Sequence, residues 1–281
     1  MAAEPHKAGD FAMRCMEIRG GSRAVEESFE TPGLDAWVYS RPFEGADSGG
    51  DLHYISVCGG GVITRLIIAD VSGHGAQVAE FSAVLRALMR KNINTKSQTG
   101  LVKALNQQFG EMAQTRHFAT AVVATYLATR QSLTVCNAGH PPPLWFRAET
   151  GKWALLDETI VDTGNLPLGL DEESPYHQFT VPLGRGDIVV FYTDALTEAT
   201  DSAGRMIGEV GLLDRVGELD RSDARRIGPA LLASVESHRG GRPAGDDVTL
   251  LVLSHNATGP RPPTLGEKVG VYAKVFGLRQ F

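Results

Sequence analysis

The sequence predicts an α+β fold in which the β-sheets are largely antiparallel. Strand-like segments form hairpins before a pair of predicted helices, and strands return after those helices. Strands and helices do not alternate along the chain, as they would in a fold built from βαβ units. A chain of 281 residues is long enough for one large domain or two small ones, and no internal repeat or low-complexity tract divides it.

The first predicted strands precede the helices. Large side chains alternate with small ones around Trp37 and Tyr39, which predicts a strand over residues 34–43. Two further strands are predicted over residues 52–58 and 62–69. Three consecutive glycines lie between these two segments and favour a tight hairpin.

Two helices are predicted next. Apolar residues recur at helical spacing after Gly75, at positions Val78, Phe81, Val84, Leu85 and Leu88. A second helix is predicted to begin at Thr99, because threonine is a favourable N-cap residue. Its apolar face consists of Leu101, Leu105, Phe109 and Met112.

Strands resume after these helices, and the strongest candidates are residues 120–127, 132–137, 144–146, 187–193 and 248–253. Helices are predicted again between Glu209 and His238, with a start signal at Ser222-Asp223. Pro229 is compatible with a helix there only if it lies in the first turn, where its missing N–H is not needed.

The chain is predicted to contain one folded domain with a segment at each end. Residues 1–33 are expected to be an N-terminal extension, residues 34–255 the domain, and residues 256–281 a proline-containing tail. The first residues lack the apolar stretch of a signal peptide, and no run reaches the roughly 18 apolar residues that span a bilayer. We therefore expect a cytoplasmic protein without a membrane segment.

Net charge and cysteine spacing indicate which partners and which cysteine chemistry to expect. The net charge of −6 does not favour nucleic acid or an anionic membrane as a partner. The cysteines, Cys15, Cys58 and Cys136, are odd in number and lack Cys-x-x-Cys spacing. This pattern is typical of reduced apolar residues rather than of a disulfide framework or a zinc site.

Aspartates stand at the ends of the apolar runs. Asp51 precedes one predicted strand, Asp70 and Asp194 each follow one, and Asp246-Asp247 precedes the last. Unpaired carboxylates at buried strand ends repel one another and are costly to desolvate, so a cluster of them is favoured when a cation shares it. Mg²⁺ and Mn²⁺ prefer such oxygen ligands. The sequence therefore predicts a centre for one or two divalent cations.

Six motifs occur in an order that resembles the PPM metal-dependent Ser/Thr phosphatases, in their bacterial SpoIIE/RsbU-like branch. The motifs are Gly49-Gly50-Asp51, Asp70 to Gly75, Asn137 to Pro142, Pro167 to Leu170, Asp187 to Ala199 and Asp246 to Thr249. The resemblance covers roughly residues 34–255. It implies an αββα sandwich, in which two stacked antiparallel sheets are flanked by helices and two Mn²⁺ or Mg²⁺ ions lie between the sheet edges.

The resemblance also implies an activity and its metal ligands. The expected reaction is hydrolysis of phosphoserine or phosphothreonine on a protein by a metal-activated water. The expected substrate is a phosphorylated anti-anti-sigma (STAS-type) regulator in partner-switching signalling. Asp70 would bridge both ions with the Val71 carbonyl as an additional ligand, Asp51 would hold the first ion or its water, and Asp194 the second ion together with Asp246 or Asp247. The sequence leaves the choice within that last pair open.

Several other polar residues have two interpretations. His74 is either a proton donor to the leaving seryl oxygen or a residue that hydrogen-bonds behind the ligands. His140 precedes three prolines and is predicted to be a structural turn residue. Thr197 is predicted to support the loop of Asp194, as is its neighbour Glu198. Arg41 and His53 are either solvated strand residues or phosphate contacts, and solvated residues are expected.

Two alternative functions remain open at this point. Tyr54 stands where members of the resembled family often have a second acid, which motivates the alternative of a non-catalytic pseudophosphatase that binds a phosphoprotein or a regulator. The four retained aspartates argue against this alternative. A Ser-His-Asp triad could use Ser72 with His74 or His140, but Ser72 lacks the Gly-x-Ser-x-Gly setting of such nucleophiles. The sequence does not name the substrate, the upstream signal, the preferred metal or the oligomeric state.

Overall fold

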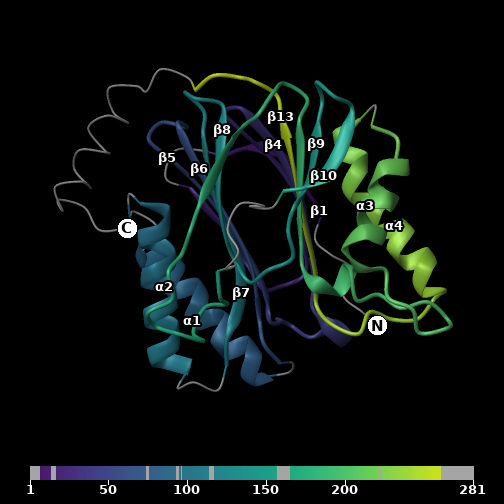
Figure 1. Cartoon of the computed structure of the whole chain (residues 1–281), viewed down its shortest axis with the longest axis horizontal. Coiled ribbons are helices and arrows are strands. Elements are labelled where there is room, and N and C mark those ends of the chain that lie inside the picture. Colours follow the sequence, from purple (N-terminus) through teal and green to yellow (C-terminus); the bar gives the residue numbers. More distant parts are fainter. Residues whose placement is uncertain are drawn as a thin grey trace.

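The computed structural model describes residues 7–13, 17–73, 76–92, 95, 97–113, 117–156, 165–221 and 223–260. Two β-sheets stack face to face, and a pair of helices covers each outer face (Figure 1). Among the strands that the structure describes, only the neighbours β1 and β3 run parallel. The predicted α+β class and the sandwich of two largely antiparallel sheets are therefore confirmed.

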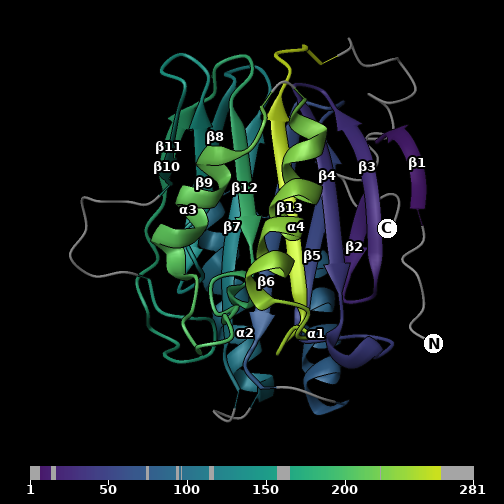
Figure 2. The same cartoon turned by 90° about the vertical axis from the view of Figure 1, so that its right-hand side faces the viewer.

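The seven-stranded sheet has its last strand in the middle. Its order is β1 (Lys7–Ala12), β3 (Val25–Thr31), β4 (Leu34–Arg41), β13 (Val248–His255), β12 (Ile188–Tyr192), β9 (Leu144–Arg147) and β10 (Lys152–Leu155). β13 pairs in antiparallel fashion with β4 on one side and β12 on the other (Figure 2). The segment before β13 and the segment after β12 therefore lie at the same edge of this sheet.

The six-stranded sheet is built around two long hairpins. Its order is β11 (Phe179–Pro182), β8 (Ser132–Ala138), β7 (Ala119–Leu127), β6 (Ile63–Val71), β5 (Asp51–Cys58) and β2 (Ile18–Gly21). The predicted turn between β5 and β6 is confirmed, and Gly59, Gly60 and Gly61 all have positive φ angles between 63° and 87°. Glycine adopts this left-handed backbone without steric penalty.

Helices complete the four layers. α1 (Ala76–Asn92) and α2 (Gln98–Ala113) cover the six-stranded sheet, and α3 (Gly208–Glu218) and α4 (Ile227–Arg239) cover the seven-stranded one (Figures 1 and 2). Three apolar cores result: one between the sheets, one under α1 and α2, and one under α3 and α4. Short 3₁₀ turns, η1 (Phe43–Gly45), η2 (Asp194–Leu196) and η3 (Ala224–Arg226), connect strands and helices. None of the helices that the structure describes is long and apolar enough to cross a membrane.

The N-terminal segment differs from its prediction. Residues 1–33 are expected to lie outside the domain, but β1, β2 and β3 from this segment join the two sheets. β3 pairs with β4 along its whole length, and Phe29 is buried in the core between the sheets. The folded unit therefore begins before residue 34. Glu26, Glu27 and Glu30 make this strand look too polar in the sequence to be a core strand.

Helix starts follow the predicted capping chemistry with one correction. The prediction that Thr99 is an N-cap is wrong, because Thr99 lies inside α2. Ser97 takes that place, and its Oγ accepts a hydrogen bond of 3.2 Å from the Gly100 N–H. The start signal near Asp223 is confirmed, since its side chain accepts from the Arg225 N–H at η3. Pro229 lies in the first turn of α4, as required.

The first residues of the predicted tail contact the domain through hydrogen bonds. Asn256 Nδ2 donates to Asp35 Oδ1 at 2.7 Å, and the Gly33 N–H donates to Thr258 Oγ1 at 2.9 Å. The rest of the tail, from residue 261, lies outside the described residues, as does Cys15. Cys136 is buried in the core under α1 and α2. The exact domain boundaries remain a prediction.

Candidate metal centre

Asp51 and Asp70 lie directly opposite each other on β5 and β6. Each shares a strand face with residues of the core between the sheets, Ile55 on β5 and Ile68 on β6, because every second residue of a strand points to the same side. Both carboxylates therefore face the seven-stranded sheet. Asp51 is 3% exposed and Asp70 is half-buried.

The other acidic residues come from the facing sheet. Asp194 begins η2, two residues after the end of β12, and Asp246 lies two residues before the start of β13. Because β12 and β13 are antiparallel neighbours, the end of one lies beside the start of the other. Thr197 Oγ1 donates to the Asp194 carbonyl at 2.9 Å and closes the turn, as predicted for this residue.

These carboxylates are close enough to perturb one another. Burial, together with the charges of Asp194 and Asp246, raises the pKa of Asp70 to about 8. Burial and then the charge of Asp70 hold the pKa of Asp51 well above its usual range. Burial, Glu198 and Asp246 raise the pKa of Asp194 to about 6. We call Asp51, Asp70, Asp194, Glu198 and Asp246 the acid cluster.

Asp247 has a different environment from its neighbour. Its Oδ1 accepts the Phe43 N–H at 2.6 Å, and its Oδ2 accepts the N–H groups of Gly50 and Asp51. A Cβ on Gly49 would overlap the Asp247 carboxylate, so a glycine is required there. Asp247 therefore acts as a clamp that joins the start of β13 to the start of β5. Asp246, which belongs to the acid cluster, is partly exposed, and its Oδ1 accepts the Asp247 N–H at 2.8 Å.

The donor set of this centre fits a hard divalent cation. All of the proposed ligands offer oxygen atoms, which Mg²⁺ and Mn²⁺ prefer. A Cβ on Gly50 would lie 3.0 Å from the Val71 carbonyl oxygen, so this glycine keeps space open beside a further oxygen donor. Among the described residues, no three His, Cys, Asp or Glu side chains stand in position to hold an ion. Ligation therefore requires the carboxylates to turn toward a shared ion.

Sequence reasoning missed Thr193. This residue is fully buried, and its Oγ1 donates to Asp51 Oδ2 at 2.7 Å. The same oxygen accepts the N–H of Thr249 at 3.0 Å. The sequence does place a hydroxyl residue between the apolar β12 and Asp194, and this position could have identified Thr193 as a partner of the ligands. Thr193 links the ligand-bearing ends of both sheets.

His140 is a turn residue, as predicted, but its ring has a further role. Asn137 accepts the His140 N–H at 2.8 Å and donates to the His140 carbonyl at 2.7 Å, which closes the turn. The imidazole is buried and bonds to Thr120 Oγ1 and to the Tyr192 carbonyl. Since both ring nitrogens are occupied, His140 is not placed to activate Ser72 as a base.

The remaining candidates fall into three groups. His74 lies outside the described residues. The expectation that His53 is solvated is wrong, because this residue is 3% exposed and burial lowers its pKa to about 4. Arg41, at the end of β4, is exposed, as expected. Tyr54 is buried under α1 and α2. It points away from Asp51, because residues three apart on a strand face opposite sides.

An open hollow adjoins the acid cluster. Glu198, Asp246, Arg239 and Arg242 are among the residues that line it. Arg242 is exposed and donates to the carbonyls of Thr200 at 2.6 Å and Arg239 at 3.1 Å. Arg242 thus brings into the hollow a guanidinium group, a side chain of the kind that binds phosphate in proteins.

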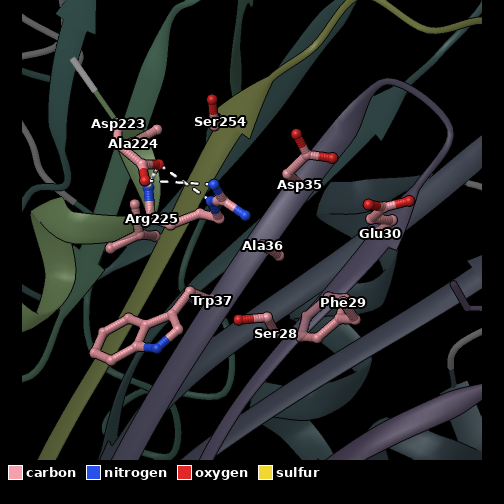
Figure 3. Close-up of a pocket in the computed structure, with 11 residues that line it drawn as sticks. Ser28, Phe29, Glu30, Asp35, Ala36, Trp37, Asp223, Ala224, Arg225 and Ser254 are labelled. Carbon is pink, nitrogen blue, oxygen red and sulfur yellow. Dashed lines mark hydrogen bonds and ion pairs between the residues drawn. The ribbon is translucent and has the colours of Figure 1, made fainter. Parts of the chain in front are cut away.

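A second pocket is lined by residues of β3, β4, β13 and the turn at η3 (Figure 3). Trp37 lies on one side of it and the Asp223–Arg225 ion pair on another. Ser254, which also lines it, is seven residues along β13 from Asp247, a separation of about 23 Å at 3.3 Å per residue. This pocket is therefore not part of the candidate metal centre.

Comparisons with known proteins identify relatives of this chain. The family model of Stage II sporulation protein E (SpoIIE) matches residues 61–256. Phosphoserine phosphatase RsbP of Bacillus subtilis (strain 168) is 29% identical over 142 residues, which are 49% of this chain and 34% of RsbP. Phosphoserine phosphatase RsbU of the same organism is 26% identical over 147 residues, 50% of this chain and 41% of RsbU. The chain thus spans less than half the length of these relatives.

A solved structure agrees with the fold. The crystal structure of the RsbU and RsbW domains of Rv1364c from Mycobacterium tuberculosis superposes with a TM-score of 0.69 at 26% identity, covering 90% of this chain and 70% of that one. The family match extends over more than half of the sequence and includes the positions of Asp70, Asp194 and Asp246. The chain therefore belongs to the SpoIIE family, the branch of the PPM phosphatases that its six motifs predict.

Proposed function

We propose that this chain is a metal-dependent phosphoprotein phosphatase that hydrolyses phosphoserine or phosphothreonine. The acid cluster is the observation that supports this proposal most strongly. Its carboxylates come from two sheets, and Asp51 is buried while Asp70, Asp194 and Asp246 are partly buried. Their charges and their burial raise the pKa values of Asp51, Asp70 and Asp194. Such crowding is unfavourable unless a cation offsets the charge, and Mn²⁺ or Mg²⁺ suits the oxygen donors.

The position of each carboxylate suggests its role. Asp70 interacts with acids of the other sheet and with Asp51, so it is proposed to bridge two ions, with the Val71 carbonyl as a further ligand. Asp51 would hold the first ion or its water, and Asp194 and Asp246 the second ion. Asp246 is preferred to its neighbour because both Asp247 oxygens accept backbone N–H groups and because the charge of Asp246 raises the pKa of Asp194. Asp246 Oδ1 also accepts the Asp247 N–H at 2.8 Å. When bound, such ions provide a hydroxide near neutral pH and offset the charge of the phosphoryl group.

Other side chains would orient these ligands and the substrate. Thr193 holds Asp51 by its hydroxyl, and Thr197 holds the turn that carries Asp194. Arg242, in the hollow beside Asp246, is proposed to attract the phosphate or an acidic neighbour in the substrate. His74 stays a candidate for proton donation to the leaving seryl oxygen.

The proposed substrate is a phosphorylated STAS-type regulator in cytoplasmic partner-switching signalling. Family membership supports this choice, together with the similarity to RsbP and RsbU, which are phosphoserine phosphatases. The similarity to a protein whose structure contains an RsbW domain besides an RsbU domain supports the same setting. Nucleic acid and membrane are not proposed as partners, and Mn²⁺ and Mg²⁺ remain alternatives.

Metal-dependent turnover tests the proposal. Hydrolysis of p-nitrophenyl phosphate and of a phosphoserine peptide should require Mn²⁺ or Mg²⁺ and stop in EDTA. Asp70→Asn and Asp194→Asn should abolish turnover with unchanged circular dichroism, whereas Asp214→Asn, at an exposed aspartate on α3, should not. Unchanged rates in both site variants would contradict the proposal. Tight binding of a phosphoprotein, with neither turnover nor Mn²⁺ heat in calorimetry, would instead favour the pseudophosphatase.

A further inference from the structure

We propose that His140 is a positioning residue that sets the separation of the two sheets at the acid cluster. His140 lies in the connection between β8 of the six-stranded sheet and β9 of the seven-stranded sheet. Its ring is 5% exposed and bonds to one residue of each sheet. The inference rests on the proposed function, since the separation matters through the ions that the carboxylates would share.

The hydrogen bonds define the form of the imidazole. A carbonyl oxygen can only accept, so Nε2 carries the proton and donates to the Tyr192 carbonyl at 3.0 Å. The neutral ring then has Nδ1 as an acceptor, and the Thr120 hydroxyl donates to it at 2.8 Å. Burial in this setting lowers the pKa of His140 to about 4, which agrees with a neutral ring. The ring thus forms a bridge with a defined direction.

Both ends of this bridge lie next to cluster residues. Thr120 on β7 is the direct register partner of Asp70 on β6. Tyr192, the last residue of β12, precedes Asp194 by two positions. The path from Asp70 to Asp194 across the sandwich therefore runs through Thr120, the His140 ring and the Tyr192 carbonyl.

The backbone of His140 is held from several sides. Asn137 closes its turn, and Gly139 forms a bridge with Ala121 of β7. A Cβ on Gly139, whose φ is +69°, would lie 2.5 Å from the ring of Pro167. The next residue, Leu168, exchanges two backbone hydrogen bonds with Ala119 at 2.7 and 2.9 Å. The motifs Asn137 to Pro142 and Pro167 to Leu170, which supply no proposed ligand, thereby acquire a common purpose as the support of this ring.

This support of the His140 ring matters because the charges of the acid cluster act against the close approach of the two sheets. Like charges from the two facing sheets repel and would move the sheets apart. Residues that orient metal ligands typically change metal affinity when they are removed, without touching the ion themselves. His140 would act in this way, through the strands that carry Asp70 and Asp194.

Two variants and a matched control test the inference. Thr120→Val removes the donor to Nδ1 at nearly constant volume, and His140→Ala removes both bonds. Thr134→Val is the control, because the Thr134 hydroxyl bonds to Thr180 at 2.9 Å at the β8–β11 edge, away from the cluster. Titration calorimetry should show Mn²⁺ affinity reduced roughly tenfold by Thr120→Val, restored by Thr120→Ser and unchanged by the control. The KM for p-nitrophenyl phosphate should stay constant while kcat falls.

A metal-free measurement separates this inference from the proposed function. In EDTA, the backbone amides of a peptide covering residues 188–196 should exchange hydrogen faster in Thr120→Val than in Thr134→Val. Each variant is measured at the same interval below its own melting temperature. Equal Mn²⁺ affinity and equal exchange in both variants would overturn the inference and leave the turnover of the unmodified protein as evidence for the function. If the unmodified protein neither binds Mn²⁺ nor turns over, the proposed function fails, and the exchange result alone decides the role of His140. If His140→Ala does not fold, the Thr120 variants decide.

Discussion

The hydroxyl of Thr193 donates a 2.7 Å hydrogen bond to Asp51 Oδ2. Thr193 follows β12 in one sheet and Asp51 opens β5 in the other, so this bond crosses the sandwich at the acid cluster. It opposes the effect of burial on the pKa of Asp51, because a donated hydrogen bond favours the ionised carboxylate. Thr193 therefore helps to keep a proposed ligand in the form that can bind a cation.

Replacing Thr193 tests this bond directly. Thr193→Val leaves Asp51 buried without its hydroxyl donor, which should lower the free energy of unfolding by about 1–3 kcal/mol. Urea denaturation in EDTA measures the change, and Thr193→Ser, which keeps a hydroxyl, is the control. Equal midpoints for the valine and serine variants would show that the bond contributes nothing.

The neighbouring acids Asp246 and Asp247 should behave differently. Asp247→Asn loses a charged acceptor for three backbone N–H groups and should destabilise the fold by about 2–3 kcal/mol. Asp246→Asn should leave stability nearly unchanged and abolish metal-dependent turnover. Denaturation midpoints and phosphatase rates of the two variants measure both effects. The reverse pattern would make Asp247 the ligand.

Gly49 should tolerate no side chain. A Cβ there overlaps the Asp247 carboxylate, so Gly49→Ala should lower the free energy of unfolding by about 2 kcal/mol or more. Gly217→Ala is the matched control, because no atom lies within 4 Å of a Cβ at this position on α3. Alanine in a helix is favoured by about 1 kcal/mol over glycine, so the control should be slightly stabilised. Similar melting temperatures for the two variants would contradict the proposed clamp.

Stability without metal should depend on pH through Asp70. Its pKa is raised from 3.8 to about 8 in the folded protein, so between these values the folded state keeps a proton that the unfolded chain has released. The contribution of Asp70 to stability is therefore fully present below about pH 4 and is lost as the pH rises toward 8. Asp70→Asn removes this dependence.

Unfolding experiments in EDTA at pH 5 and pH 8 provide the measurement. The stability of Asp70→Asn relative to the unmodified protein should be higher at pH 8. Comparing the two proteins isolates Asp70 from the buried His140, whose lowered pKa acts in the opposite direction. A difference that does not change with pH would be inconsistent with a raised pKa.

Arg242 should contribute to substrate binding. Its position in the hollow beside Asp246 predicts that Arg242→Ala raises the KM for a phosphoserine peptide about tenfold, or about 1.4 kcal/mol, with little change in kcat. Arg225→Ala is a suitable control, because this exposed arginine pairs with Asp223 at the distant pocket. Steady-state kinetics of both variants provide the measurement. A lower kcat with an unchanged KM in Arg242→Ala would indicate a role in turnover instead of substrate binding.

The sequence predicts the central elements well because their periodicity is strong. All five residues of β12 are buried, and α1 has a regular apolar face. β3 is missed because its acidic residues hide the alternation that buries Phe29. Hydrophobic periodicity identifies a strand by its alternating apolar residues, and several charged residues in a strand make this alternation too weak to recognise.

The candidate site is predictable only in part for a similar reason. Asp51, Asp70 and Asp194 were identifiable because each stands at the end of an apolar run. The separate tasks of Asp246 and Asp247 depend on the N–H groups of a segment nearly 200 positions earlier in the chain. No local pattern encodes such a contact. The partners of the His140 ring were hidden in the same way.

The central place of β13 has a consequence for how the protein is made. This strand is the last one in the part of the chain that the structure describes, yet it lies between β4 and β12 and brings Asp246 and Asp247 to the edge of the sheet. A nascent chain that has not yet released residues 246–255 from the ribosome has two unjoined halves of one sheet and an incomplete ligand set. Synthesis of the domain must therefore be finished before the proposed ligand set is complete, and we expect a fragment that ends before residue 246 to lack the proposed phosphatase activity.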